Sequence, residues 1–164
     1  MILYMRYIKV FEDFYEVNEI GYRPIDNNEI TSNTQNYLND IFFKELGKSE
    51  PNFEIIENLL KNKIVDINCK GIWNRTALHL SAYYNHINII KMLLELGIDI
   101  ESLDIWDKTA LHVASFYNRF EIIQMLLNKG SDNNKKDSYG KTAWDYANEF
   151  IKISLPELKP KNKE

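Results

Sequence analysis

The chain has 164 residues, a net charge of −4 and an apolar content of 45%. This length fits one ordinary domain with at most a small extension, and the apolar content is sufficient for a buried core. The acidic balance excludes a strong positive field for nucleic acid or an anionic membrane, and the single cysteine, Cys69, excludes an internal disulfide and a cysteine-built metal site.

The sequence predicts neither a secretory signal nor a membrane span. Arg6 and Lys9 interrupt the first apolar run, and apolar stretches elsewhere are too short to cross a bilayer. We therefore expect a cytoplasmic protein, with secretion into a host cell as an effector as the alternative. The skew toward Ile, Asn, Lys and Tyr suggests AT-rich coding DNA, as in a small-genome bacterium or a large virus.

Residues 1–34 are predicted to form a β-hairpin followed by a linker. Residues 3–11 and 14–20 alternate in polarity and are rich in aromatic and β-branched residues, with a turn at Glu12 and Asp13. Residues 24–36 contain the Pro, Asp, Asn, Thr and Ser typical of a linker. Because an isolated hairpin is marginally stable in water, we expect it to pack on the first helices.

The middle of the chain contains a repeat of 33 residues. When residues 71–103 are compared with residues 104–136, fifteen of the 33 positions are identical. Thr-Ala-Leu-His occurs at 76–79 and again at 109–112, and a further copy begins at Thr142. Two helices that resemble each other by chance would not also align their turns, so the sequence predicts a tandem array.

Each copy predicts a pair of helices. Thr76 and Thr109 are suited to cap a short first helix, and Asn85 ends it because asparagine tolerates the left-handed conformation. Apolar residues at spacings of three and four predict second helices over 87–96 and 120–129. A helix pair of this size cannot bury its apolar stripe alone, so the copies are expected to stack around a continuous core.

This pattern resembles the ankyrin repeat, whose signature is Thr-Pro-Leu-His-x-Ala followed by a helix and Gly-x-Asp. Alanine replaces the proline in every copy. The Asp-x-x-Gly-x-Thr turn is complete at 137–142, whereas Asn74 and Asp107 replace its glycine in the earlier copies; these two residue types tolerate positive φ best. The resemblance implies a mostly α-helical solenoid over residues 35–155.

The edges of the array are degenerate. The apolar residues of 53–60 match the second half of a repeat, and residues 37–46 are expected to be its first helix. Pro156 and Pro160 interrupt the stretch that aligns with the last second helix. We therefore predict an N-terminal cap repeat at 35–66, repeats at 67–100 and 101–133, a truncated C-terminal cap at 134–155 and a flexible tail at 156–164.

The sequence predicts no enzyme, no metal site and no cofactor. His79 and His112 occupy equivalent positions, where the family uses a histidine to hydrogen-bond the turn, and Asp145 replaces it in the last copy. A zinc site would need further ligands at a suitable spacing. Cys69 has no neighbouring histidine, and the chain has no glycine-rich phosphate loop.

The resemblance directs attention to the concave face, which ankyrin proteins form from their turn tips and the exposed side of their first helices. An aromatic row at the tips contains Trp73, Trp106 and Tyr139. A basic row contains Arg75, Lys108 and Lys141. A second aromatic row contains Tyr83, Tyr84, Phe116, Tyr117 and Phe150. The same face is expected to include Ile72, Ile105, Ser138 and Glu149. These rings either pack between repeats or contact a partner, and eight of them on one face favour a partner.

We expect a monomeric, non-enzymatic protein–protein interaction module. The aromatic rows predict a partner with an apolar centre, and the basic row predicts an acidic rim. The alternative is single-stranded nucleic acid stacked on the aromatic and basic strip, against which the acidic pI and the turn aspartates weigh. An active site in the N-terminal hairpin would have neither a cleft nor a catalytic set. Bacterial ankyrin proteins of this size include host-directed effectors and toxin-immunity proteins, and the sequence is compatible with both roles.

Overall fold

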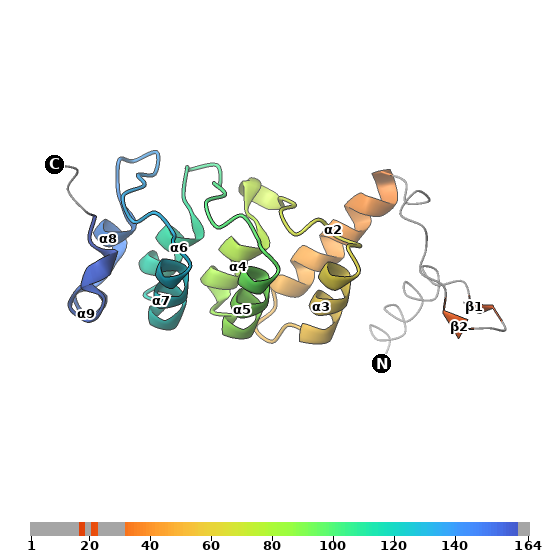
Figure 1. The fold of residues 1–164 in the computed structure, drawn as a ribbon. Helices are drawn as coiled ribbons and strands as arrows, with labels where there is room; N and C mark the ends of the chain where they lie inside the picture. The colour runs from red at the N-terminus through yellow and green to blue at the C-terminus, as the bar shows by residue number, and fades with distance from the viewer. Residues whose placement is uncertain (1–16, 19–20, 23–31, 161–164) are drawn as a thin grey trace. The chain divides into compact units, whose positions relative to one another are not determined.

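The computed structural model describes residues 17–18, 21–22 and 32–160 of the chain (Figure 1). The chain divides into two units, residues 1–37 and 38–164. In the first unit, β1 (Val17–Asn18) pairs antiparallel with β2 (Gly21–Tyr22). The hairpin predicted from residues 3–11 and 14–20 is not supported, because its first strand and its turn lie outside the described residues and Val17–Asn18 pair with a later segment.

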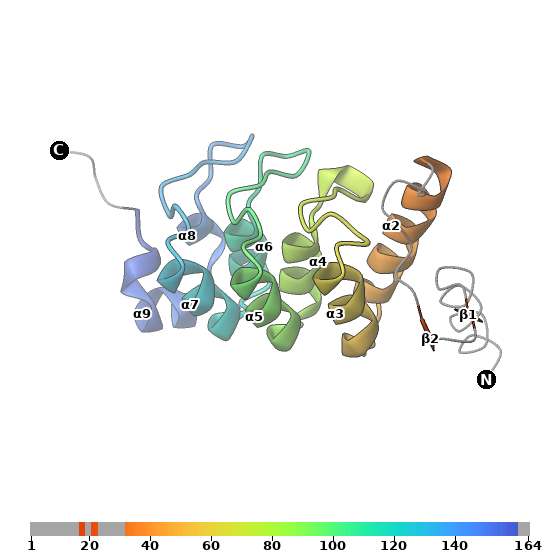
Figure 2. The same ribbon diagram turned by 45° about the vertical axis from the view of Figure 1, so that its right-hand side comes forward.

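The second unit consists of stacked helix pairs, the first of which includes the part of α2 from Leu38 onward. Figures 1 and 2 show the pairs side by side in chain order, with the first helices in one layer and the second helices in the other. The first helices are α2 (Ser32–Leu46), α4 (Ala77–Tyr84), α6 (Ala110–Phe116) and α8 (Ala143–Tyr146). The second helices are α3 (Phe53–Lys61), α5 (Ile87–Glu95), α7 (Phe120–Asn128) and α9 (Glu149–Ser154). The predicted solenoid of helix pairs is confirmed.

Local signals start and end these helices. Thr76, Thr109 and Thr142 each cap a first helix: the threonine side chain accepts from the backbone N–H three residues on, and the side chain of that residue accepts from the threonine N–H. Asn85 ends α4 in the left-handed conformation, with a φ of 66°. Asn74 and Asp107 both have a φ of 56°, as expected for residues that replace the turn glycine.

A continuous aliphatic core joins the layers. Helix α6 packs against both α4 and α8 and against its own second helix, α7. The largest fully buried side chains from α4 to α9 are Leu78, Ile90, Leu93, Leu111, Ile122, Ile123, Leu126 and Ile151. Removing one such side chain typically costs about 2–5 kcal/mol of stability, so the stack depends on contacts that no single pair could make.

The ends of the array differ from the prediction. Helix α2 begins at Ser32, so the predicted linker over 24–36 ends inside a helix. The repeat spacing puts the last second helix 33 residues after Phe120, at Ile153, but α9 begins at Glu149 because Asn148 accepts a hydrogen bond from the Ile151 N–H and caps it there.

The predicted flexible tail starts with an ordered turn. The 3₁₀ helix η3 (Pro156–Leu158) buries the side chain of Leu158 completely. The Asn133 side-chain amide donates to the carbonyls of Glu157 and Lys159, at 2.7 and 3.1 Å. The last repeat therefore closes with residues 155–159, and residues 161–164 lie outside the described part of the chain.

Candidate functional site

The turns that precede α4, α6 and α8 form a row of three tips. We call residues 71–76 tip 1, residues 104–109 tip 2 and residues 137–142 tip 3. In each tip the first N–H donates to the carbonyl four residues later, at 2.9, 3.0 and 2.9 Å. The tips are joined in turn: the Ile105 N–H donates to the Trp73 carbonyl and the Ser138 N–H donates to the Trp106 carbonyl, both at 3.0 Å. The row is therefore a regular, hydrogen-bonded edge.

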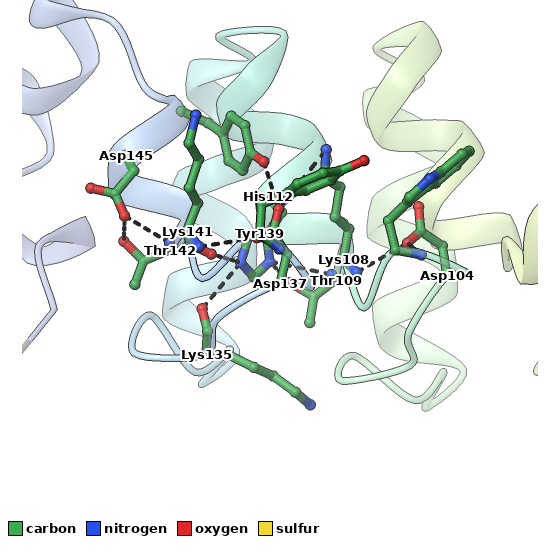
Figure 3. A network of polar contacts seen from close by, with 12 residues as sticks. Asp104, Lys108, Thr109, His112, Lys135, Asp137, Tyr139, Lys141, Thr142 and Asp145 are labelled. Carbon is green, nitrogen blue, oxygen red and sulfur yellow. Dashed lines mark hydrogen bonds and ion pairs between the residues drawn. The ribbon is translucent and has the colours of Figure 1, made fainter.

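A buried aspartate shapes each of the last two tips. Asp104 Oδ1 accepts from the N–H groups of Trp106 and Lys108, at 2.9 and 3.0 Å. Asp137 Oδ1 accepts from Tyr139 and Lys141, both at 3.0 Å (Figure 3). Both bonds use the same oxygen, so Oδ2 of each aspartate is left for the preceding tip.

Two cations of the predicted basic row pair with these carboxylates. Arg75 Nε lies 3.7 Å from Asp104 Oδ2, and Lys108 Nζ lies 4.0 Å from Asp137 Oδ2. Both aspartate side chains are fully buried. Arg75 and Lys108 therefore join successive tips, whereas Lys141 has no ion pair with any described residue and is exposed.

Aromatic rings surround the two paired cations. The Arg75 guanidinium lies 5.2 Å from the Trp73 ring, 5.7 Å from Trp106 and 6.0 Å from Tyr83. Such cation–π contacts contribute about 0.5–1 kcal/mol at exposed sites and more when they are desolvated. Trp106 and Tyr83 are half-buried, so part of each ring does pack between repeats.

The second cation has its own set of rings. Lys108 Nζ lies 4.6 Å from the Tyr146 ring and 5.7 Å from both Phe116 and Tyr139. Tyr117 extends the cluster, because its ring lies 4.6 Å from Tyr83 and 5.0 Å from Phe116. The rings of the tips and of the first helices therefore form one connected patch.

The outer rings of this patch face solvent. Trp73 is 54% exposed and Tyr139 is 64% exposed, and Trp73 contacts the half-buried Trp106 at a ring distance of 5.9 Å. Further exposed apolar side chains on the tips and first helices are Ile72, Tyr84, Ile105, Phe116 and Tyr117. We call the exposed side chains of the tips and of α4 and α6 the turn-tip face.

Two residues assigned to this face by position lie elsewhere. Glu149 and Phe150 belong to α9, a second helix, because the last helix pair is shorter than the repeat spacing predicts. The Phe150 ring contacts Phe120 of α7, at 6.0 Å. Exposed Phe150 and Ile153 therefore form a separate surface on α9.

The sequence does not single out Tyr146, although it completes the site. Its hydroxyl donates to Asp137 Oδ2 at 2.6 Å, and its ring lies under both Lys108 and Lys141. Burial raises the pKa of the Tyr146 hydroxyl above its usual value. The pKa of Asp137 would rise through burial, but the hydrogen bonds from Tyr146 and from the tip 3 N–H groups lower it. The sequence does contain a signal for this residue. At the 33-residue spacing Tyr146 aligns with Val113 and Leu80, so a tyrosine stands where the earlier copies have an aliphatic side chain.

The two repeat histidines join tips rather than forming a reactive centre. The Thr76 N–H donates to His79 Nδ1 at 3.3 Å, so Nε2 carries the proton and donates to the Lys108 carbonyl at 2.8 Å. His112 makes the same bond to Thr109, and its Nε2–H points to the Lys135 and Lys141 carbonyls at 3.1 and 3.2 Å (Figure 3). Burial lowers the pKa of both histidines. The predicted turn-bonding role is confirmed.

The described residues also include a cysteine and further potential metal ligands. Burial, with a smaller effect of nearby Asp66, raises the pKa of the Cys69 thiol to about 12, which keeps the sulfur protonated and a poor nucleophile at neutral pH. Among the residues that the structure describes, no three His, Cys, Asp or Glu side chains cluster as ligands for a metal ion. No helix in this part of the chain is long and apolar enough to span a bilayer.

Comparison with known protein families agrees with the stacked architecture. A family model described as ankyrin repeats, in three copies, matches residues 47–137, which is more than half of the chain. A search of curated proteins found no match. The matched region includes α3 to α7 and tips 1 and 2. The chain belongs to the ankyrin repeat family.

Proposed function

We propose that the chain is a non-enzymatic module that binds another protein through the turn-tip face. Ankyrin repeats are generally protein–protein interaction modules and are typically non-enzymatic. The observation that supports this face is its connected patch of exposed rings, from Trp73 on tip 1 to Tyr139 on tip 3. Contiguous exposed aromatic surface of this kind is typical of partner sites, and Trp and Tyr dominate the residues that carry binding energy.

The surroundings of the rings also support binding. Arg75 and Lys108 lie against the rings and are themselves paired with buried carboxylates. Rings held in place before binding lose less conformational entropy when a partner arrives. The turn-tip face is therefore suited to rigid, specific contact with a protein surface.

The pairing of the cations narrows the chemistry of the partner. Arg75 and Lys108 are neutralised by Asp104 and Asp137, so we infer an apolar partner surface whose acidic groups are concentrated near Lys141. The same pairing favours a protein over single-stranded nucleic acid, because a phosphate backbone would gain little from cations that carboxylates already hold.

The candidate biological roles share this mechanism. A host-directed effector and a toxin-immunity protein would each act by covering one surface of a partner in a stoichiometric complex. We propose that the turn-tip face makes that complex in either case. Identification of the partner by affinity capture separates the two roles.

The test compares two double variants that remove similar exposed apolar area. Trp73→Ala with Tyr139→Ala alters the turn-tip face, whereas Phe150→Ala with Ile153→Ala alters exposed side chains of α9. With each protein as bait, we expect partners captured by the unaltered chain to be lost from the first variant and kept by the second, while both keep a cooperative thermal transition. Equal capture by the tip variant, or loss only from the α9 variant, would contradict the proposal.

A further inference from the structure

Each tip holds the next one through the same two groups, a backbone carbonyl and a cation two residues later. Tip 1 offers the Trp73 carbonyl to the Ile105 N–H and Arg75 to Asp104. Tip 2 offers the Trp106 carbonyl to Ser138 and Lys108 to Asp137 in the same way. In both cases the receiving tip begins with an aspartate, followed by the residue whose N–H donates and then by an aromatic residue. This is the pattern Asp-x-aromatic.

Tip 3 presents the same two groups, and no further tip among the described residues receives them. Within residues 35–160, no N–H donates to the Tyr139 carbonyl and no carboxylate pairs with Lys141 Nζ. The Tyr139 ring is largely exposed, and Lys141 Nζ lies 5.2 Å from the centre of the Tyr146 ring. The edge that carries two internal junctions is therefore open at this end.

The helices beneath tip 3 do not offer the matching contacts for another repeat. His79 and His112 each donate a ring N–H to a carbonyl of the next tip. At the equivalent position, Asp145 accepts the N–H and hydroxyl of Thr142, both at 2.8 Å, and has no N–H to donate onward. The open end is thus suited to a short turn rather than to a whole helix pair.

We propose that the open end of the tip row binds an acidic Asp-x-aromatic turn of a different protein; this inference rests on the proposed function and names the chemistry of its partner. The partner's aspartate would place one carboxylate oxygen on Lys141, and the N–H of its next residue would donate to the Tyr139 carbonyl. The partner's aromatic ring would then extend the row that runs through Trp73, Trp106 and Tyr139.

Tip 1 of a second copy stacked head to tail does not supply that turn. The residue of tip 1 that aligns with Asp104 and Asp137 is Gly71. A Cβ at this position would lie 3.0 Å from ring carbons of Phe43, so the packing against α2 disfavours a carboxylate there. A copy stacked head to tail would leave Lys141 without an anion, which favours a different protein as the occupant.

The test uses a phage library of disulfide-cyclised seven-residue peptides, selected against the full chain at low salt. We expect enrichment of Asp followed two positions later by Trp, Tyr or Phe. Binding of the best synthetic peptide is then measured by fluorescence polarisation. Lys141→Glu should weaken it about tenfold, because reversal removes an attraction and adds a repulsion. Lys129→Glu makes the same charge change at the exposed end of α7 and should change affinity less than twofold.

Other outcomes separate this inference from the proposed function. Peptides that are sensitive to Trp73→Ala but not to Lys141→Glu would overturn the acidic turn and keep the turn-tip face. Peptides insensitive to both variants would contradict both proposals. Equal weakening by Lys129→Glu and Lys141→Glu, or no enrichment of aspartate, would overturn the inference as well.

Discussion

The two junctions between tips are built alike, but only in the second do both oxygens of the buried carboxylate accept hydrogen bonds. In both, a cation surrounded by rings meets a buried carboxylate of the next tip. Asp137 Oδ2 also accepts the Tyr146 hydroxyl, whereas Asp104 Oδ2 and Arg75 Nε are buried without a hydrogen-bond partner. The residue that aligns with Tyr146 in the earlier copy is Val113. One side chain thus decides whether the carboxylate of a junction is satisfied.

The backbone conformation also differs between the two junctions. Trp73 of tip 1 has a φ of 59° and a ψ of 31°, a left-handed conformation that is unfavourable for a bulky residue by roughly 1–2 kcal/mol. Trp106, its counterpart in tip 2, does not have a positive φ. The first junction therefore combines local strain with a buried carboxylate oxygen, Asp104 Oδ2, that accepts no hydrogen bond. The second has neither, so we expect it to contribute more to stability.

Low pH is expected to weaken both junctions at once and to have the largest effect on the free energy of unfolding. The pKa values of His79, His86 and His112 are all lowered in the folded chain, chiefly by burial, so the unfolded chain binds protons more readily. The contribution of these histidines to the free energy of unfolding is then fully present above pH 6.5, the usual histidine pKa. It is lost as the pH falls below that value. Urea unfolding from pH 8 to pH 5 measures this.

A double variant isolates the junction histidines. His79→Gln with His112→Gln should lower stability at pH 8 but flatten the decline, because only His86 then remains to titrate. A decline that keeps its full slope in the double variant would mean that these histidines are not its origin.

Removal of each junction aspartate compares the two junctions directly. Asp137→Ala removes the acceptor of two N–H groups, the partner of Lys108 and the partner of Tyr146, and should cost about 3 kcal/mol. Asp104→Ala removes the two N–H bonds and the Arg75 contact at 3.7 Å but no hydroxyl bond, and should cost clearly less. Denaturant unfolding at pH 7 gives both values; equal costs would contradict the comparison.

Tyr146→Phe isolates the one hydrogen bond that separates the junctions. It leaves Asp137 Oδ2 buried without its hydroxyl donor and should cost about 1–3 kcal/mol. Tyr139→Phe is the matched control, because the Tyr139 hydroxyl makes no hydrogen bond to any residue that the structure describes and its ring is largely exposed. Thermal unfolding of the two variants side by side tests this; an equal loss in both would show that the hydroxyl of Tyr146 is not the cause.

Replacement of each tip tryptophan by asparagine is expected to give the smallest difference in stability between the two junctions. Trp73→Asn loses ring contacts but relieves the left-handed strain, so its net effect should be about 0 ± 1 kcal/mol. Trp106→Asn loses ring contacts with no such relief and should destabilise by about 1–2 kcal/mol. A larger loss at position 73 than at position 106 would mean that the left-handed backbone of tip 1 carries no strain.

The sequence was sufficient for the repeat and the tips because both depend on local signals. The capping threonines and the Asn and Asp of the turns act within a few residues, so their spacing predicted α4 to α7. The start of α9 could not be taken from the repeat spacing, because Asn148 offers a closer cap. Burial of Leu158 depends on contacts made only when the last repeat closes.

Prediction of the site was limited in the same way. The basic row was found as a surface feature, but its neutralisation depends on stacking, which brings Asp104 to Arg75 and Asp137 to Lys108. A spacing of 29 residues from the basic residue to the aspartate recurs in both pairs and could have indicated this. The role of Tyr146 required knowledge of which way that ring points.

Oxidative footprinting of the complex with the captured partner tests the turn-tip face most directly. Hydroxyl radicals modify exposed aromatic side chains, and mass spectrometry reports each site separately. We predict that the partner protects Trp73 and Tyr139, while Phe150 on α9 is modified as in the free chain. Protection of Phe150 with unchanged modification of Trp73 and Tyr139 would contradict binding through this face.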